Sequence, residues 1–313
     1  MREEIIVSGR LNPYVDPHLA IWHWQIPLYL FLGGLAAGIM FFAALYTIMN
    51  KEEKYPGAVR RAPIIVPFIL VIGLLALFLD LKHKLFFWQL YTIIRIESPM
   101  SWGAWTLMAV TPVSIIWAAM HIREFLPKWD WKYEILKDME VLALKYKLQI
   151  AWVMIILSVI LGIYTGILLS AFNARPLWNT SILGPLFLAS GLSAGAATII
   201  LFAPSKEERL LFSKIDLLLI AVELFLIVHM FMGFSASTSV QIEAVNLFLG
   251  GPYTAVFWIF VVILGMFIPA TLEILELRHK KIPVLIPVLF VLFGSIMLRF
   301  IIVYAGQMSR WLY

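Results

Sequence analysis

Three side chains that can exchange protons or hydrogen bonds lie near the ends of long apolar stretches of this sequence. His23 lies near the start of the first stretch, Asp80 ends the second, and Tyr164 lies near the end of the fourth. An imidazole and a carboxylate can accept protons, and a phenol can donate a hydrogen bond. Ionisable groups at membrane depth are costly and usually face a cavity or one another. These residues therefore form a candidate binding site.

His23 and Asp80 each have an alternative interpretation that involves no binding site. His23 lies between Trp22 and Trp24 and also fits an aromatic belt at a membrane surface. Asp80 is followed by lysines at positions 82 and 84 and also fits an ordinary interfacial charge.

Three further ionisable residues, Glu223, His229 and Arg299, lie inside apolar stretches of the C-terminal half. An unpaired buried charge is strongly unfavourable, so we expect Arg299 to pair with Glu223 or another acid. The three form a candidate proton relay, for which a structural ion pair is the alternative. His229 and His23 also leave haem b held between two imidazoles as an alternative, although the sequence lacks the paired histidines of a two-haem membrane cytochrome.

The composition excludes a water-soluble globular protein. Of the 313 residues, 62% are apolar and 14% charged, against about 45–50% and about 25% in soluble domains. The sequence has no cysteine, so it cannot hold an iron–sulfur cluster through thiolates, a disulfide or a Cys-ligated metal. The net charge of +5 does not indicate nucleic-acid binding, because Lys and Arg cluster in short loops beside apolar stretches.

Eight apolar stretches are candidates for helices that cross a bilayer, which needs about 20 residues per helix. They cover residues 19–49, 62–81, 99–121, 148–172, 180–203, 214–233, 252–276 and 283–306. The segments on one side of these spans carry 16 Lys and Arg residues, against 7 on the other. We therefore predict a bacterial inner-membrane protein with both termini in the periplasm. The charged segment 129–146 predicts an interfacial helix on the cytoplasmic side.

The two halves of the sequence share a weak repeat with an offset of 157 residues. GLAAG at 34–38 corresponds to GLSAG at 191–195, and Pro112 corresponds to Pro269. Repeats of four helices have the same orientation in the membrane, and small residues allow close helix contact. We predict an all-α integral membrane protein with eight transmembrane helices arranged as two four-helix bundles. The first, residues 1–179, includes the interfacial helix, and the second covers residues 180–313.

Six segments carry a resemblance to a known family. They are PLYLFLGGLAAG (27–38), LDL (79–81), SPMSWGAW (98–105), YTGILLS (164–170), RPLWN (175–179) and RFIIVYAGQ (299–307). With these segments the sequence resembles the NrfD/PsrC family, the membrane subunits of polysulfide reductase and related molybdenum-enzyme complexes. The resemblance covers most of the sequence, and SPMSWGAW and YTGILLS are its more specific segments. The stretch 81–84 after Asp80 departs from the family pattern.

The resemblance implies an eight-helix subunit, without a metal of its own, that exchanges electrons and protons with a quinone (menaquinone or ubiquinone) near the outer face. It implies a ferredoxin-like iron–sulfur partner subunit that docks there and a molybdopterin or other catalytic subunit. For the quinone site it implies an acid, a histidine and a tyrosine. Asp80 and His23 then accept the protons of the quinol, and Tyr29 or Tyr164 contacts the ring. A secondary transporter and a purely structural membrane anchor are the alternatives.

Overall fold

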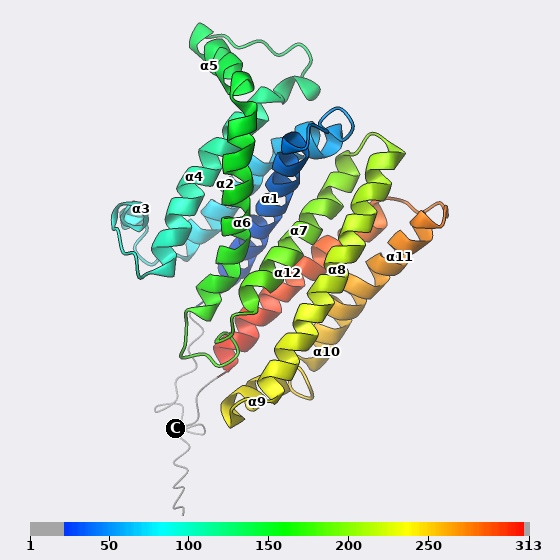
Figure 1. Cartoon of the computed structure of the whole chain (residues 1–313). Helices are drawn as coiled ribbons and strands as arrows, with labels where there is room; N and C mark the ends of the chain where they lie inside the picture. Colours follow the sequence, from blue (N-terminus) through cyan, green and yellow to red (C-terminus); the bar gives the residue numbers. More distant parts are fainter. Residues whose placement is uncertain (1–21, 310–313) are drawn as a thin grey trace, which may run out of the picture.

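The computed structural model describes residues 22–309, and within them eight helices are long and apolar enough to cross a membrane (Figure 1). This confirms the predicted all-α fold and its eight spans; residues 19–21 of the first predicted span lie outside the described residues. The spans are α1 (Gln25–Ile48), η2, η3 and α2 together (Gly57–Asp80), α4 (Pro99–Met120), α6 (Lys147–Ser170), α7 (Leu183–Phe202), α8 (Lys206–Ser235), α10, η6 and α11 together (Thr254–Leu277), and α12 (Leu285–Met308).

Two of the spans change their helical geometry along their length. The second begins with the π turn η2 (Gly57–Arg61) and the 3₁₀ turn η3 (Ala62–Ile65) before α2 (Val66–Asp80). The seventh consists of α10 (Thr254–Val256), the π-helix η6 (Phe257–Phe267) and α11 (Ile268–Leu277). The π-helix ends just before Pro269, whose ring would clash with the carbonyl four residues earlier in a regular α-helix.

Short helices occupy the connections between the spans. They are η4 (Lys84–Phe86), α3 (Gln89–Thr92), η5 (Ile122–Glu124), α5 (Glu134–Lys145) and α9 (Ser239–Asn246). The predicted helix at 129–146 is present as α5, which projects beyond the spans at the top of Figure 1. Its buried Glu140 accepts two hydrogen bonds from the Arg123 guanidinium at 2.6 and 2.9 Å and one from the Trp131 indole at 3.0 Å, which fixes the base of the helix.

The start of the sixth span differs from its predicted position for a local reason. The helix begins at Lys206 rather than at residue 214, because Ser205 caps it: the Glu208 amide donates to the Ser205 hydroxyl at 3.1 Å. Glu207 and Glu208 in the first turn add favourable interactions with the helix dipole. The charged first two turns therefore belong to the same helix as the apolar span that follows them.

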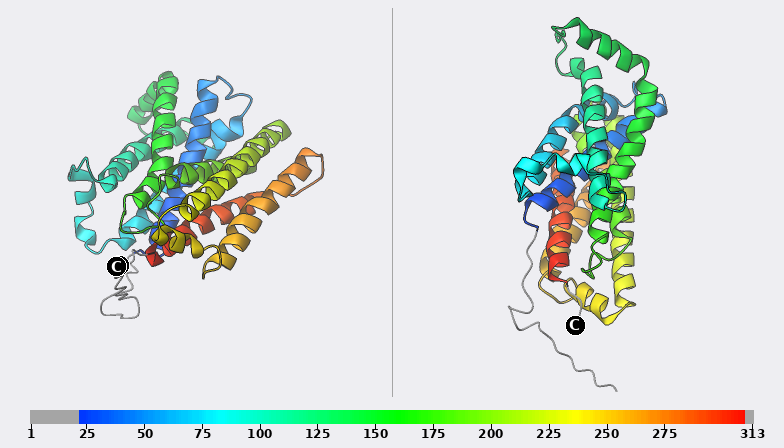
Figure 2. Two further views of the ribbon diagram at one scale, coloured as in Figure 1. Left: turned by 60° about the horizontal axis from the view of Figure 1, so that its bottom comes forward. Right: turned by 90° about the vertical axis from the view of Figure 1, so that its left-hand side faces the viewer.

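Helices α1 and α7, the first spans of the two repeats, lie at the centre of the molecule (Figure 2). Both contact α6 and α12 as well as each other. They are the most buried spans, because 78% and 72% of the residues in their 18-residue apolar stretches are buried. They cross at the repeated glycines: a Cβ added at Gly191 would lie 2.7 Å from the Gly34 carbonyl oxygen. The repeat noticed in the sequence is therefore a backbone contact between its two copies. The division into two bundles stays a prediction.

The spans leave the molecule with two distinct ends. Trp22 and Ser309 lie at the same end as α3 and α9, and we call this the outer end because it is predicted to face the periplasm (Figure 1). At the opposite, inner end lie α5 and the connections 49–56, 203–205 and 278–284.

Candidate functional site

A cavity near the outer end is lined by three of the predicted site residues. Asp80 at the last position of α2, Tyr29 on α1 and Tyr164 on α6 all face it, so three helices each supply one polar group. The remaining lining residues are Trp22, Ile26, Leu77, Leu81, Leu90, Tyr91, Met100, Ala104, Leu107 and Leu168. The cavity measures about 70 Å³, which is enough for a few water molecules. A larger ligand requires side chains of the lining to move. Its walls are apolar and its polar groups few, as in small-molecule sites.

His23 lies next to this cavity. It precedes α1, its side chain is exposed, and it is close enough to Asp80 for an electrostatic interaction between the imidazole and the carboxylate. Asp80 itself is partly buried. The acid therefore has one face in the apolar cavity and a basic neighbour on the exposed side, which is an arrangement that can pass a proton between the cavity and the outer surface.

The two candidate tyrosines lie together. The phenols of Tyr29 and Tyr164 are within hydrogen-bonding reach of each other, and both side chains are buried. Tyr164 reaches this position because α4 has a glycine there: a Cβ at Gly103 would overlap the Tyr164 ring and hydroxyl. Gly103 belongs to the SPMSWGAW segment and Tyr164 to YTGILLS, so the two most specific segments of the sequence meet in this contact. The sequence left open which tyrosine contacts the ligand, and both line the cavity.

A third tyrosine, Tyr91 on α3, was not predicted from the sequence. It enters the cavity from the connection between the second and third spans. Burial raises the pKa of the Tyr91 phenol, which therefore remains a hydrogen-bond donor at neutral pH. Nothing in the local sequence separates Tyr91 from the neighbouring aromatic residues, because the segment has no helical or strand periodicity that would place one side chain inward.

The backbone beside His23 is held by the last turn of α12. The Gln307 carboxamide accepts from the Trp22 amide at 2.8 Å and donates to the Trp22 carbonyl at 2.9 Å. The Trp22 ring stacks on Trp178 with ring centroids 5.2 Å apart. Arg175 donates to the Gln307 carbonyl at 2.8 Å and so fixes the end of α12. The eighth span thus anchors the entry to the first span at the outer site.

The predicted partners Arg299 and Glu223 lie in one buried cluster on the other side of the α1–α7 crossing. The Arg299 guanidinium donates to the Ser190 hydroxyl, the Ser295 hydroxyl and the Phe187 carbonyl at 2.8, 2.8 and 3.1 Å. Glu223 interacts electrostatically with Arg299 and lies close to the Ser190 hydroxyl. The two charges therefore meet around a shared serine, and the cluster is closed to solvent, since Arg299 is 0% and Glu223 4% exposed.

His229, the third residue predicted for this group, lies elsewhere on α8. Its side chain is exposed and stacks on the Phe225 ring, with the ring centroids 5.9 Å apart. Glu223 is buried on the same helix, so the two residues occupy different faces of α8. His229 and His23 therefore have separate neighbours, a phenyl ring and a carboxylate.

A pair of buried acids continues the polar cluster toward the inner end. Asp216 on α8 and Glu273 on α11 are 0% and 1% exposed, and their carboxyl groups are in hydrogen-bonding contact. Ser193 on α7 donates to Asp216 Oδ1 at 2.5 Å. Asp216 was not singled out in the sequence, because it follows Lys214 near the predicted start of a span and so looks like a boundary charge.

The described residues contain no group of three or more His, Asp and Glu side chains that could hold a metal ion. The polar side chains around the cavity can transfer protons and donate hydrogen bonds, and its apolar walls can bind a ring.

Comparison with known proteins gives a consistent result along the whole sequence. Residues 15–309 match the family model described as "Polysulphide reductase, NrfD". The protein is 33% identical to the C subunit of polysulfide reductase from Wolinella succinogenes, over 96% of its own length and 97% of that relative. It is 31% identical to protein NrfD of Escherichia coli, over 92% and 96% of the two sequences. A protein NrfD homologue of Haemophilus influenzae is 30% identical over 95% and 97%. With its eight apolar helices and a match over nearly its whole length, this multi-pass membrane protein belongs to the polysulphide reductase NrfD family.

Proposed function

We propose that this protein is the quinone-reacting membrane subunit of a multi-subunit respiratory oxidoreductase in a bacterial inner membrane. The observation that supports this most directly is that Asp80, Tyr29 and Tyr164, from three different helices, line one apolar cavity near the outer end. A quinone needs an apolar site for its ring and polar groups at its two oxygens, and the cavity has both. The relative from Wolinella succinogenes is named as one part of a polysulfide reductase, which agrees with a role within a larger complex.

The residues around the cavity divide the chemistry between them. A quinol delivers two protons and two electrons when it is oxidised. The Asp80 carboxylate accepts one proton from a ring hydroxyl, the His23 imidazole at the exposed edge accepts the other, and the two electrons pass to the iron–sulfur partner subunit. Tyr29, Tyr164 and Tyr91 donate hydrogen bonds to ring oxygens and orient the ring. Leu77, Leu107 and the other apolar side chains of the lining exclude water from the ring.

The carboxylate of Asp80 provides the decisive test. Asp80→Asn keeps the shape of the side chain and removes the proton acceptor, so quinol-coupled turnover of the intact complex is expected to fall by about a hundredfold. Electron transfer from the partner subunits to a soluble dye should persist. The matched control is Asp138→Asn on the exposed face of α5, which removes a carboxylate far from the cavity. Near-normal quinol turnover in Asp80→Asn would contradict the proposal and leave Asp80 as an interfacial charge.

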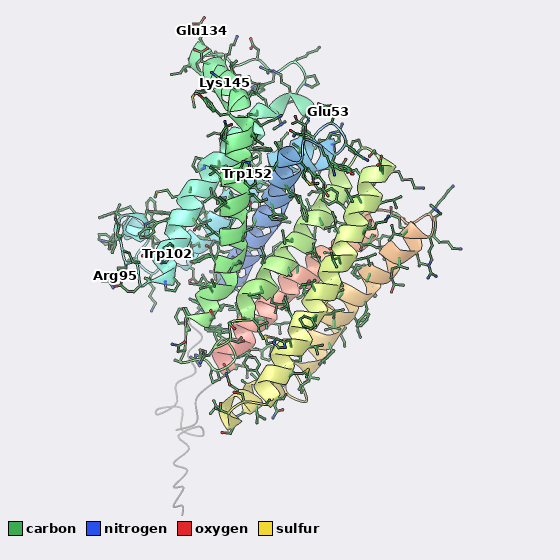
Figure 3. All side chains as sticks on the ribbon, viewed as in Figure 1. Glu53, Arg95, Trp102, Glu134, Lys145 and Trp152 are labelled. Carbon is green, nitrogen blue, oxygen red and sulfur yellow. The ribbon has the colours of Figure 1, made fainter. Side chains whose placement is uncertain are left out.

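An iron–sulfur partner subunit of ferredoxin type, itself joined to a molybdopterin or other catalytic subunit, is proposed to dock at the outer end. The segment 82–98 covers the cavity there and exposes large apolar side chains, with Leu85 87%, Ile94 72% and Ile96 69% exposed. Arg95 and Trp102 mark this corner in Figure 3. A photo-crosslinker in place of Ile94 should capture the partner, and one in place of Ile135 on α5 should not. Capture only from α5 would move electron entry to the inner end.

Glu223, Arg299 and His229 are proposed to form a proton relay in the second half of the protein. The shared contact of Glu223 and Arg299 with Ser190 supports a link between the first two, and His229 joins them only through movement of its side chain. Glu223→Gln should then reduce proton release linked to turnover while quinol oxidation continues. Unchanged proton release would favour the structural ion pair.

A further inference from the structure

We propose that Asp216 and Glu273 form a proton-binding site in the membrane, in which two carboxyl groups share one proton. This site goes beyond the quinone reaction and lies on the opposite side of the α1–α7 crossing from the cavity. It consists of one carboxyl from α8 and one from α11, with the Ser193 hydroxyl of α7 as a third member.

The hydrogen bonds of the pair indicate the shared proton. The two carboxyl groups contact each other at hydrogen-bonding distance, yet two carboxylates have no hydrogen between them. Asp216 Oδ1 receives the Ser193 hydroxyl, while Asp216 Oδ2 and Glu273 Oε2 are buried without a donor. Buried polar atoms without partners are rare in folded proteins. A single proton held between the carboxyl groups supplies the missing donor and leaves one negative charge instead of two.

The charged groups around the pair do not neutralise its second negative charge in place of that proton. Glu276 on α11 and Glu223 on α8 act on the pair with the same sign as its own charge. Arg299 on α12 is the cation of the neighbouring cluster, where its guanidinium is engaged by Ser190, Ser295 and the Phe187 carbonyl. Two ionised carboxylates at this place would repel each other in a medium of low polarity.

At the repeat offset, the first half of the protein carries aliphatic residues in place of these acids. At the offset of 157 residues, Asp216 corresponds to Val59 and Glu273 to Ile116 in the first half. Val59 is fully buried in the same way as Asp216. Ile116 is partly buried, so the first half accommodates aliphatic side chains at both of these positions. Ionisable groups placed in a membrane span without a packing role usually have a functional one.

Glu276, which acts electrostatically on Glu273, lies between the pair and the inner end of α11. The Ser213 hydroxyl on α8, one turn before Asp216, lies 3.1 Å from the Arg209 carbonyl and 3.4 Å from Glu276 Oε2, and Glu276 is only partly buried. Glu276 lies three residues after Glu273, on the same side of α11. The pair thus holds a proton that exchanges with the inner side through Glu276.

Infrared difference spectroscopy of the full-length protein in lipid nanodiscs tests the shared proton directly. The spectrum of wild type minus the double variant Asp216→Asn/Glu273→Gln should contain one carboxylic-acid carbonyl band and one set of carboxylate bands in equal amounts. The variant keeps the size of both side chains and offers amide donors. The control difference, wild type minus Asp138→Asn, should contain carboxylate bands without the acid band, because Asp138 is exposed.

Any other result of the infrared measurement would overturn the proposal. Two carboxylate sets without an acid band, or a spectrum that changes when sodium replaces potassium, would mean that a metal cation or a distant charge neutralises the pair. Two acid bands would mean two separate neutral acids. If the double variant does not fold, Asp216→Val with Glu273→Ile, which copies the first repeat, provides the reference, and this variant is expected to accumulate at the wild-type level.

Discussion

At the scale of single residues, the outer cavity depends on a contact between two residues that contribute to it unequally. Tyr164 supplies a phenol, and Gly103 supplies only the space that the phenol occupies. The absence of a side chain at this position of α4 is therefore as specific as the tyrosine on α6. This explains why both positions lie in segments of distinctive sequence.

Gly103→Ala is predicted to displace Tyr164. The added methyl would overlap the tyrosine ring, and overpacking of this kind costs about 1 to 3 kcal/mol. We expect a lower melting temperature of the purified protein and weaker quinol binding. In a Tyr164→Leu background the same substitution should cost much less, because the overlapping ring is gone.

Gly233→Ala is the matched control for this experiment. Gly233 lies on α8 with no atom within 4 Å of an added Cβ, so its substitution should leave the melting temperature unchanged or raise it. Equal effects of Gly103→Ala in the presence and absence of the Tyr164 ring would show that the contact does not decide the stability of the site.

The candidate site residues could be predicted from the sequence to different degrees for physical reasons. Asp80 and Tyr164 interrupt apolar spans, and the span limits give their depth, so their shared level near one end follows from counting residues. Tyr91 lies in a connection without periodicity, and only the folded segment shows which way it points. Asp216 lies at a span boundary, where a charge needs no special explanation, until the capped start of α8 moves that boundary eight residues earlier.

At the scale of secondary-structure elements, α12 connects the two halves of the molecule. It carries Arg299 in the buried cluster and, two turns further on, Gln307 at the outer site. The Gln307 carboxamide forms both of its hydrogen bonds with the backbone of Trp22, the residue before His23. A helix that shifts along its axis would therefore move His23 relative to Asp80.

Gln307→Leu is predicted to release the start of α1. Loss of two hydrogen bonds that position backbone costs about 1 to 3 kcal/mol, and we expect quinol turnover to fall several-fold through a higher KM, with assembly of the complex intact. Gln149→Leu, on the exposed inner turn of α6, is the control. A normal KM in Gln307→Leu would show that His23 is positioned without this anchor.

His121, at the inner end of α4, is predicted to make the fold sensitive to acid. Burial lowers its pKa, with Lys147 and Arg60 acting in the same direction, and the neutral ring donates from Nδ1 to the Trp117 carbonyl at 3.0 Å. The unfolded protein therefore binds this proton more readily than the folded protein. Stability is fully present above the unfolded value of about 6.5 and is lost as pH falls below it.

The measurement is the melting temperature of wild type and His121→Gln between about pH 7.5 and about pH 5. Wild type should lose more stability on acidification than the variant, which has no imidazole to protonate but keeps a donor for Trp117. Parallel curves for the two proteins would assign the acid sensitivity to other groups.

At the scale of the whole molecule, the sequence predicted the number and approximate limits of the spans because each requirement is local. Length and apolar composition decide whether a segment crosses the membrane, and the eight predicted stretches all correspond to observed helices. The order in which the helices surround one another is not local. The crossing of α1 and α7 was visible only as a repeated glycine pattern, and the buried series from Arg299 to Glu273 required side chains from four helices to be brought together.

The orientation of the molecule is predicted by its charge distribution, with 16 Lys and Arg residues in the segments on the inner side and 7 on the outer. Because the natural sequence has no cysteine, single cysteines report sidedness without competing thiols. Lys84→Cys, in the exposed segment beside the cavity, should react with a membrane-impermeant maleimide in intact cells. Lys128→Cys, in the exposed connection before α5, should react only after the inner membrane is permeabilised. The reverse pattern would place the outer cavity at the cytoplasmic face and the Asp216–Glu273 pair toward the periplasm. It would also reverse the direction of the proton exchange proposed for each site, because the positions of both sites relative to the spans are fixed by the fold.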